Sequence, residues 1–185
     1  MSHLDLGVIG NCSIAALIDR NASVVWYSVP RFDGDPVFHS LLGVPKGAEG
    51  EGVFAIEIED YIQSEQHYAS NTAILETTLN GKHGSLRVSD FVPRFWWRDR
   101  TFVPQTLVRR LVPISGSPRV RIRVRPRFDY GSTAPALTIG PHHIRYVGPN
   151  TTLRLTTNAP IDYVREETLF NLSRPIDLIL GVDET

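Results

Sequence analysis

The chain contains 185 residues, of which 42% are hydrophobic and 21% charged, and its 19 basic and 20 acidic side chains leave a net charge of −1. This composition is typical of a folded soluble domain, and the near-neutral charge excludes a dedicated nucleic-acid binder, which needs a strongly basic surface. No apolar run approaches the roughly 20 residues that cross a bilayer, and the first residues show no signal-peptide pattern. The single cysteine, Cys12, is typical of a reducing compartment, so we expect a cytoplasmic protein without a membrane partner.

The first predicted elements lie in the N-terminal quarter of the chain. The segment that begins at Trp26 indicates a strand that runs into a loop fixed by Pro30. Residues 36–42 predict a short helix, because Pro36 suits a first helical turn and Gly43 follows as a stop.

The rest of the chain alternates apolar and polar residues with a period of two, which is typical of half-buried strands. Turn-forming residues separate these runs, and Asn80-Gly81 is the best local hairpin signal. The predicted strands cover residues 53–59, 73–79, 85–92, 105–113, 119–127, 142–147, 151–157 and 175–182.

Many short strands separated by turns predict an all-β fold, an antiparallel β-sandwich with large sheets and one short helix near 36–42. We expect residues 1–185 to form a single domain. The last predicted core strand ends three residues before Thr185 without a finishing tail, so we also expect that the chain was excised from a longer polypeptide.

Patterns for catalysis, metal binding and cofactors are lacking. The histidines do not show zinc-site spacing, and Asp33-Gly34-Asp35 lacks the further ligands of a calcium loop. Cys12 has no basic partner nearby in the sequence, and no nucleophile elbow or phosphate-binding glycine loop occurs. Asp33, Asp35, Asp90 and Asp129 lie in or beside turns, where aspartate usually serves turn chemistry. We therefore predict no catalytic residue, no metal site and no cofactor.

Two aromatic segments are the candidate functional sites. Residues 26–33 combine aromatic, guanidinium and carboxylate groups, and residues 91–98 are rich in aromatic rings bounded by charge. Aromatic faces stack on sugar rings, while arginine and aspartate hydrogen-bond hydroxyls, although the same residue types also serve as core or interdomain anchors. The candidates for a substrate pocket or a domain interface are Trp26, Arg31, Phe32, Asp33, Trp96 and Trp97.

Five arginines alternate with apolar residues over 119–127. Such a face invites a phosphate or nucleic-acid hypothesis. We interpret it as a solvated sheet face, because arginine stems also cover apolar surface.

Seven motifs occur in order along the chain, at residues 9–17, 24–26, 30–33, 75–77, 88–93, 108–110 and 126–131. Together they resemble the trehalase-like N-terminal domain of glycoside hydrolase family fifteen, which contains prokaryotic glucoamylases and trehalases. Asn11 stands where that family commonly has Asp, and Gly34-Asp35 replaces its usual Ser-Pro-type continuation. The resemblance runs from about Leu4 to the C-terminus.

The resemblance implies a non-catalytic β-sandwich of the super-sandwich type, whose partner is a C-terminal α/α toroid that carries the catalytic carboxylates and is missing from this chain. The full-length enzyme would hydrolyse an α-glucoside. The domain would pack on the catalytic barrel, and the loop at Arg31–Asp33 would narrow the substrate pocket. The exposed interdomain face leaves self-association open.

Two rival functions remain open. One is an autonomous carbohydrate-binding module that stacks sugar on Trp26, Trp96 or Trp97. The other is a pure assembly module that makes no contact with sugar.

Overall fold

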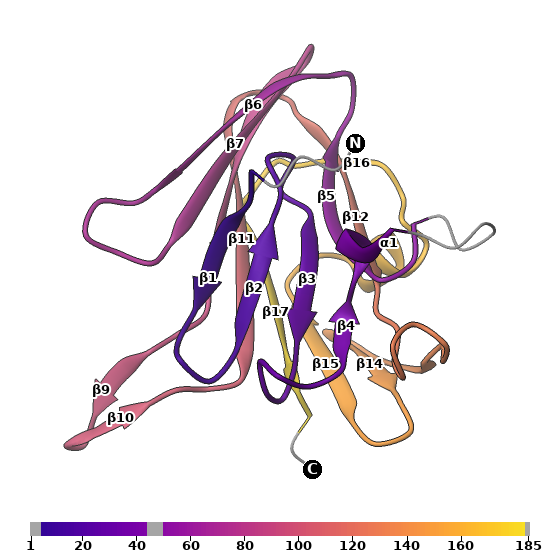
Figure 1. Cartoon of the computed structure of the whole chain (residues 1–185). Coiled ribbons are helices and arrows are strands. Elements are labelled where there is room, and N and C mark those ends of the chain that lie inside the picture. The colour runs from indigo at the N-terminus through magenta and orange to yellow at the C-terminus, as the bar shows by residue number, and fades with distance from the viewer. Residues whose placement is uncertain (1–4, 44–49, 184–185) are drawn as a thin grey trace.

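The computed structural model describes residues 5–43 and 50–183 and shows two facing antiparallel sheets with a projecting hairpin (Figure 1). The first sheet contains β1 (Gly7–Gly10), β2 (Ala15–Ile18), β3 (Val24–Ser28), β4 (Pro36–Phe38), β5 (Val53–Ile58), β12 (Arg119–Arg125) and β16 (Phe170–Asn171). The second contains β6 (Tyr61–Tyr68), β7 (Leu75–Gly81), β8 (Gly84–Phe91), β11 (Thr106–Gly116), β13 (Ala136–Gly140), β14 (His143–Val147), β15 (Thr152–Thr157) and β17 (Ile176–Val182).

The remaining elements are the hairpin of β9 (Phe95–Trp97) and β10 (Arg100–Phe102), the 3-10 helix η1 (Ser40–Leu42) and the helix α1 (Ile161–Arg165). Strands follow the order β1-β2-β3-β5-β12-β16 in the first sheet, with β4 paired to β3. The order in the second sheet is β13-β14-β15-β17-β11-β8-β7-β6. The all-β sandwich class predicted from the sequence is confirmed.

The period-two alternation places one face of each sheet in a shared core. On β12, Val120, Ile122 and Val124 are buried, and the arginines between them lie on the other face. Leu178 and Leu180 of β17 contribute to the same core from the second sheet. Burial of these apolar side chains from both sheets is the main favourable contribution to folding.

All eight strands predicted from residue 53 onward are present, with ends within three residues of the expected ones. The turn of the predicted hairpin differs, because Gly81 pairs with Gly84 and the two turn residues are Lys82 and His83. A Cβ on Gly81 would lie 2.6 Å from the Glu59 carbonyl oxygen. Close packing against the neighbouring segment, and not the turn itself, therefore requires this glycine.

The helix predicted over 36–42 is only partly present and needs correction. Pro36, Val37 and Phe38 form β4, whose side chains are all buried, and only η1 within this range is helical. Pairing with β3 and burial outweighed the local signal of a proline followed later by glycine. The helix α1 instead packs beside β12. Within the described ranges, neither helical segment has the length and apolarity to cross a membrane.

Candidate functional site

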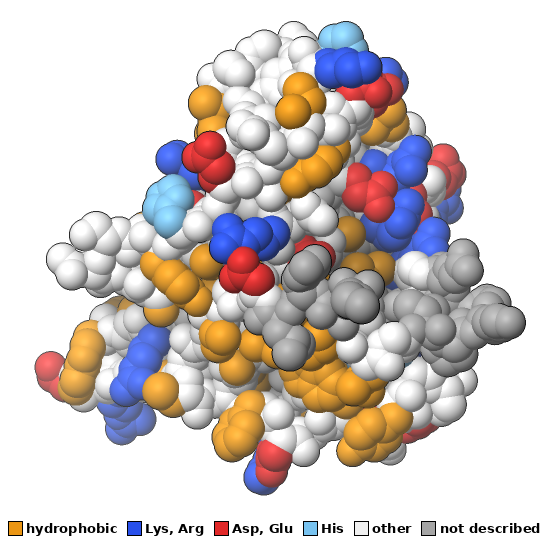
Figure 2. All heavy atoms as spheres, turned by 45° about the horizontal axis from the view of Figure 1, so that its top comes forward, with side chains coloured by type: hydrophobic (Ala, Val, Ile, Leu, Met, Phe, Trp, Pro, Cys, Tyr) orange, Lys and Arg blue, Asp and Glu red, His pale blue; other side chains and the backbone are white. Residues whose placement is uncertain are grey.

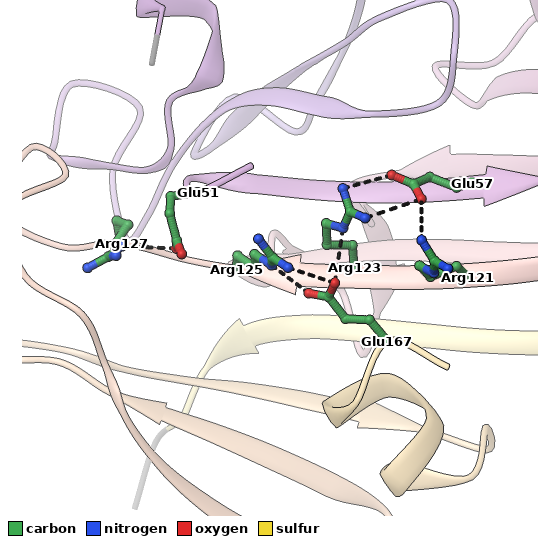
Figure 3. Close-up of polar contacts among 7 residues, drawn as sticks. All are labelled: Glu51, Glu57, Arg121, Arg123, Arg125, Arg127 and Glu167. Atoms are coloured by element: carbon green, nitrogen blue, oxygen red, sulfur yellow. Dashed lines mark hydrogen bonds and ion pairs between the residues drawn. The ribbon is translucent and has the colours of Figure 1, made fainter. Parts of the chain in front are cut away.

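The arginine face of β12 carries its own counter-charges (Figure 3). Nη1 of Arg123 lies 2.9 Å from Oε1 of Glu57, which comes from the neighbouring strand β5. Glu167, just after α1, accepts hydrogen bonds from Nε of both Arg123 and Arg125, at 3.1 and 2.6 Å. The bond to Glu167 raises the pKa of Arg125. This ladder of ion pairs continues to Arg119–Glu59, Arg121–Glu57 and Arg127–Glu51. The face therefore does not present a free basic stripe, which agrees with its interpretation as a solvated sheet face.

A further arginine, Arg109, lies in the interior between the sheets. Arg109 of β11 and Asp90 of β8 are both fully buried, and Nε of Arg109 donates to Oδ1 of Asp90 at 2.7 Å. The guanidinium also donates to the carbonyl oxygens of Phe54 and Ala22, and it lies 4.6 Å from the centre of the Phe54 ring. Burial raises the pKa of Asp90, and the Arg109 charge opposes this effect. The pair joins the two sheets and removes Asp90 from the candidate carboxylates.

The loop between β3 and β4 presents the predicted Arg31–Asp33 group to solvent. Nε and Nη2 of Arg31 each lie 2.9 Å from a carboxylate oxygen of Asp33, which makes a bidentate pair. The hydrogen bond from Arg31 lowers the pKa of Asp33 below its ordinary value. Between them, Phe32 is 66% exposed. Trp26 precedes this loop on β3, where it is partly buried opposite Leu17 of β2.

A pocket of about 450 Å³ lies beside this loop. The backbone N–H of Tyr130 donates to Oδ1 of Asp35 at 2.8 Å, so the β3–β4 loop and the loop at residues 128–133 are tied together. Asp129, Tyr130 and Gly131 have φ values of 51°, 53° and 91°. Gly131 also abuts His39, since a Cβ there would lie 2.8 Å from Nε2. Both its positive φ and this contact explain a glycine at position 131.

Two carboxylates line the pocket, but their surroundings do not suit general acid catalysis. Asp129 is exposed, and its Oδ2 accepts a hydrogen bond from Oγ1 of Thr133 at 2.7 Å. Asp35 is half-buried and accepts the Tyr130 bond. A glycosidase acid needs burial in apolar surroundings, and neither of these two side chains is fully buried. The pair is therefore suited to hydrogen bonding with a ligand.

The β9–β10 hairpin presents the second predicted aromatic group. It leaves the sandwich between β8 and β11 and stands apart from both sheets (Figure 1). Trp96 and Trp97 are 75% and 55% exposed, and the neighbouring Phe95 is 47% exposed. Phe102 stacks on Phe95 with ring centres 5.7 Å apart, and the Arg98 guanidinium lies 4.9 Å from the centre of the Trp97 ring. We call this group, Phe95, Trp96, Trp97, Arg98 and Phe102, the aromatic hairpin.

One buried side chain, that of Asn11, connects the two sides of the base of the aromatic hairpin. Nδ2 of Asn11, in the β1–β2 turn, donates at 2.9 Å to the carbonyl oxygens of Pro93 and Pro104, which flank the hairpin on its two sides. Oδ1 of Asn11 accepts from the backbone N–H groups of Ser13 and Ile14. An aspartate could accept the latter two bonds but could not donate the former two. Asn11 therefore fixes where the hairpin leaves the sandwich.

The six predicted site residues form two separate groups. Trp26, Arg31, Phe32 and Asp33 belong to β3 and its loop, and Trp96 and Trp97 belong to the hairpin. Within residues 5–43 and 50–183, no hydrogen bond or ion pair joins the two groups. Sequence reasoning missed Asn11 and Tyr130 as parts of these sites. Tyr130 lies in a segment quoted for the family resemblance, but its exposed position at a pocket depends on the loop conformation.

Comparisons with known proteins agree on one family. The family model described as "Trehalase-like, N-terminal" matches residues 4–167. Trehalase 1 of Sulfolobus acidocaldarius is 29% identical over 163 residues, which are 86% of this chain and 26% of that protein. The trehalase of Thermoplasma volcanium is 30% identical over 160 residues, which are 84% of this chain and 24% of that protein. The chain spans about a quarter of the length of these curated relatives. No solved structure matches the chain significantly.

Proposed function

The chain belongs to the trehalase-like N-terminal family, and we propose that it is the non-catalytic N-terminal β-sandwich domain of a longer α-glucoside hydrolase of trehalase or glucoamylase type. Two relatives named trehalase match over most of this chain but over only about a quarter of their own length, which supports a partnership with a further, catalytic domain. We include a cytoplasmic location in the proposal, which the single cysteine supports.

The aromatic hairpin is the observation that carries this proposal. Trp96 and Trp97 expose most of their indole surface, and tryptophans of this kind are the usual anchors of protein interfaces. Because Asn11 holds both sides of the hairpin base, the place where the hairpin leaves the sandwich is set before any partner arrives. Contact with the catalytic domain would bury the rings and stabilise both partners.

The β3–β4 loop has a second role in the proposal, which is to narrow the substrate pocket of the catalytic domain. Its support is chemical, because a bidentate arginine–carboxylate pair and an exposed Phe32 offer hydrogen bonds and an apolar surface at one place. Substitution of Arg31 or Asp33 in the longer enzyme should therefore change KM or substrate preference while the fold persists. Unchanged kcat and KM would leave the loop with a structural role only.

Association in trans tests the interdomain contact. The 185-residue chain is mixed with the separately produced catalytic domain, and the dissociation constant is measured for the natural chain and for a Trp96→Ser, Trp97→Ser double variant. We expect at least about tenfold weaker binding by the double variant, because exposed tryptophan anchors dominate such contacts. Tyr61→Ser, at a 48% exposed tyrosine on β6, is the matched control and should bind normally. Equal binding by all three chains contradicts the proposal.

A glucose-release assay tests the non-catalytic part of the proposal. The chain alone should release no glucose from trehalose, maltose or isomaltose. Hydrolysis by the chain that is lost in Asp33→Asn or Asp35→Asn would overturn the proposal, because catalysis would then reside in this domain.

A further inference from the structure

We propose that the pocket between the β3–β4 loop and the loop at residues 128–133 binds a neutral hexopyranose unit. The proposed site belongs wholly to this chain, so it does not depend on the interdomain contact proposed for the aromatic hairpin. The site also does not include Trp26, Trp96 or Trp97, on which the sequence predicted that a sugar could stack.

The pocket has the size and the mixed lining of a small-ligand site. Its volume of about 450 Å³ falls within the roughly 300–1,000 Å³ of typical ligand pockets. Val29, Val37 and Phe128 contribute apolar surface and are themselves buried in the sandwich, so this wall is part of a rigid framework. Asp35 and Asn150 contribute polar groups to the same lining. A few polar groups on an apolar wall are what orients a polar ligand in a site of this kind.

Tyr130 supplies the stacking surface. Tyr130 lines the pocket and is 76% exposed, so its phenol ring is accessible to a ligand. The backbone is left-handed at this position, with φ of 53°, and the bond from its N–H to Asp35 holds it there. A bulky residue occupies this region of φ/ψ only when the surrounding loop enforces it. The apolar C–H face of a pyranose ring fits against such an exposed phenol ring.

The charge of the lining selects against other small ligands. The guanidinium of Arg31 is engaged by Asp33, which leaves the carboxylates of Asp35 and Asp129 as the uncompensated charges of the pocket. Two carboxylates repel an anion such as a phosphate ester. Within the described residues, no group of three or more histidine, cysteine, aspartate or glutamate side chains could hold a metal ion. Sugar hydroxyls suit this lining because each can donate to a carboxylate oxygen or pair with the Asn150 amide.

Titration of the 185-residue chain tests the proposal directly. D-glucose, maltose and trehalose are added in turn, with choline as a cationic probe, while amide signals are followed by two-dimensional NMR. We expect saturable shifts at Tyr130, Gly131 and Asn150 with the sugars. Tyr130→Ala should weaken binding about tenfold, whereas Tyr130→Phe, which keeps the ring, should change it by less than about twofold. The control Tyr61→Ala, at an exposed tyrosine of β6, should bind normally.

Three results would overturn the proposal. The absence of saturable shifts with all three sugars excludes a sugar site, and stronger shifts with choline would assign the pocket to a cation. Unchanged binding in Tyr130→Ala, with a loss in Trp96→Ser, would move sugar binding to the aromatic hairpin. If Tyr130→Ala is unfolded by circular dichroism, Asn150→Ala tests the same pocket through an exposed side chain and should weaken binding by about tenfold. Failure here leaves the association test of the hairpin unaffected, because that test uses different residues and a different partner.

Discussion

The arginine face of β12 and the aromatic hairpin are two conspicuous surface features. They differ in whether other residues of the chain pair with their side chains. Every arginine of the β12 face meets a glutamate from β5, from the segments just before and just after β5, or from the segment after α1. Figure 3 shows these pairs for Arg121, Arg123, Arg125 and Arg127. The hairpin instead leaves Trp96 and Trp97 mostly in solvent. A charged face with internal partners needs no external ligand, whereas a fixed, exposed aromatic group is typical of an interface.

The space-filling view agrees with this contrast. In Figure 2, basic and acidic side chains intermingle in a compact group on one side of the visible face, and orange apolar side chains spread over its lower part. Opposite charges that alternate at short range largely cancel at a distance. The charged groups of the β12 face therefore serve mainly the stability of the fold, and the following variants test this contrast with the hairpin.

The largest effect is expected from the interior arginine. Arg109→Met leaves Asp90 buried without a counter-charge and removes the bonds to Phe54 and Ala22, so we expect about 3–5 kcal/mol of lost stability in urea unfolding. Arg110→Met is the control on the next residue, which is exposed and lies on the other face of β11, and it should cost less than about 0.5 kcal/mol. Equal effects of the two substitutions would refute the role assigned to the buried pair.

A smaller effect is expected at the base of the aromatic hairpin. Asn11→Asp replaces both donated bonds with contacts between a carboxylate and two carbonyl oxygens. We therefore expect the free energy of opening of the hairpin to fall by about 2 kcal/mol. Hydrogen exchange of the amides in residues 94–103 measures this change. Asn21→Asp, at an exposed asparagine in the β2–β3 turn, should leave that exchange unchanged. Unaltered exchange in Asn11→Asp would mean that the hairpin is held by other contacts.

The ion-pair ladder should respond more weakly. Glu167→Gln removes the charge that pairs with both Arg123 and Arg125 at a side chain that is 18% exposed, and we expect a loss of about 1 kcal/mol. Glu166→Gln, at the exposed neighbouring residue, should have little effect on thermal unfolding. If binding of a polyanion at low salt appears only in Glu167→Gln, the glutamates indeed neutralise the face.

The smallest effect concerns the β3–β4 loop. Because Arg31 lowers the pKa of Asp33, the favourable pairing is present above the ordinary aspartate pKa of 3.8 and is lost as the pH falls through the lowered value. Arg31→Gln should return the Asp33 pKa upward toward 3.8, which an NMR titration of the carboxylate measures. An unchanged pKa would show that the pair does not persist in solution.

The sequence predicted the sandwich because alternating runs such as that of β12 signal both strand and buried face. It could not predict β6, whose side chains are largely exposed on both faces, or the extended β4, because Pro36 and the later Gly43 favour a short helix there. The aromatic segments were identified from residue type alone. Their separation into two groups, the anchoring by Asn11 and the position of Tyr130 all depend on contacts between residues 82 to 95 positions apart, which local patterns do not contain.

The accessibility of the hairpin tryptophans tests the central claim most directly. Acrylamide quenching of fluorescence is compared between the 185-residue chain and a longer polypeptide in which the proposed catalytic domain follows it. Versions with Trp96→Phe and Trp97→Phe isolate the hairpin signal. We predict strong quenching of the hairpin tryptophans in the chain alone and marked protection in the longer polypeptide. Equal quenching in both would show that the hairpin faces solvent in the longer polypeptide and is not the proposed interdomain contact.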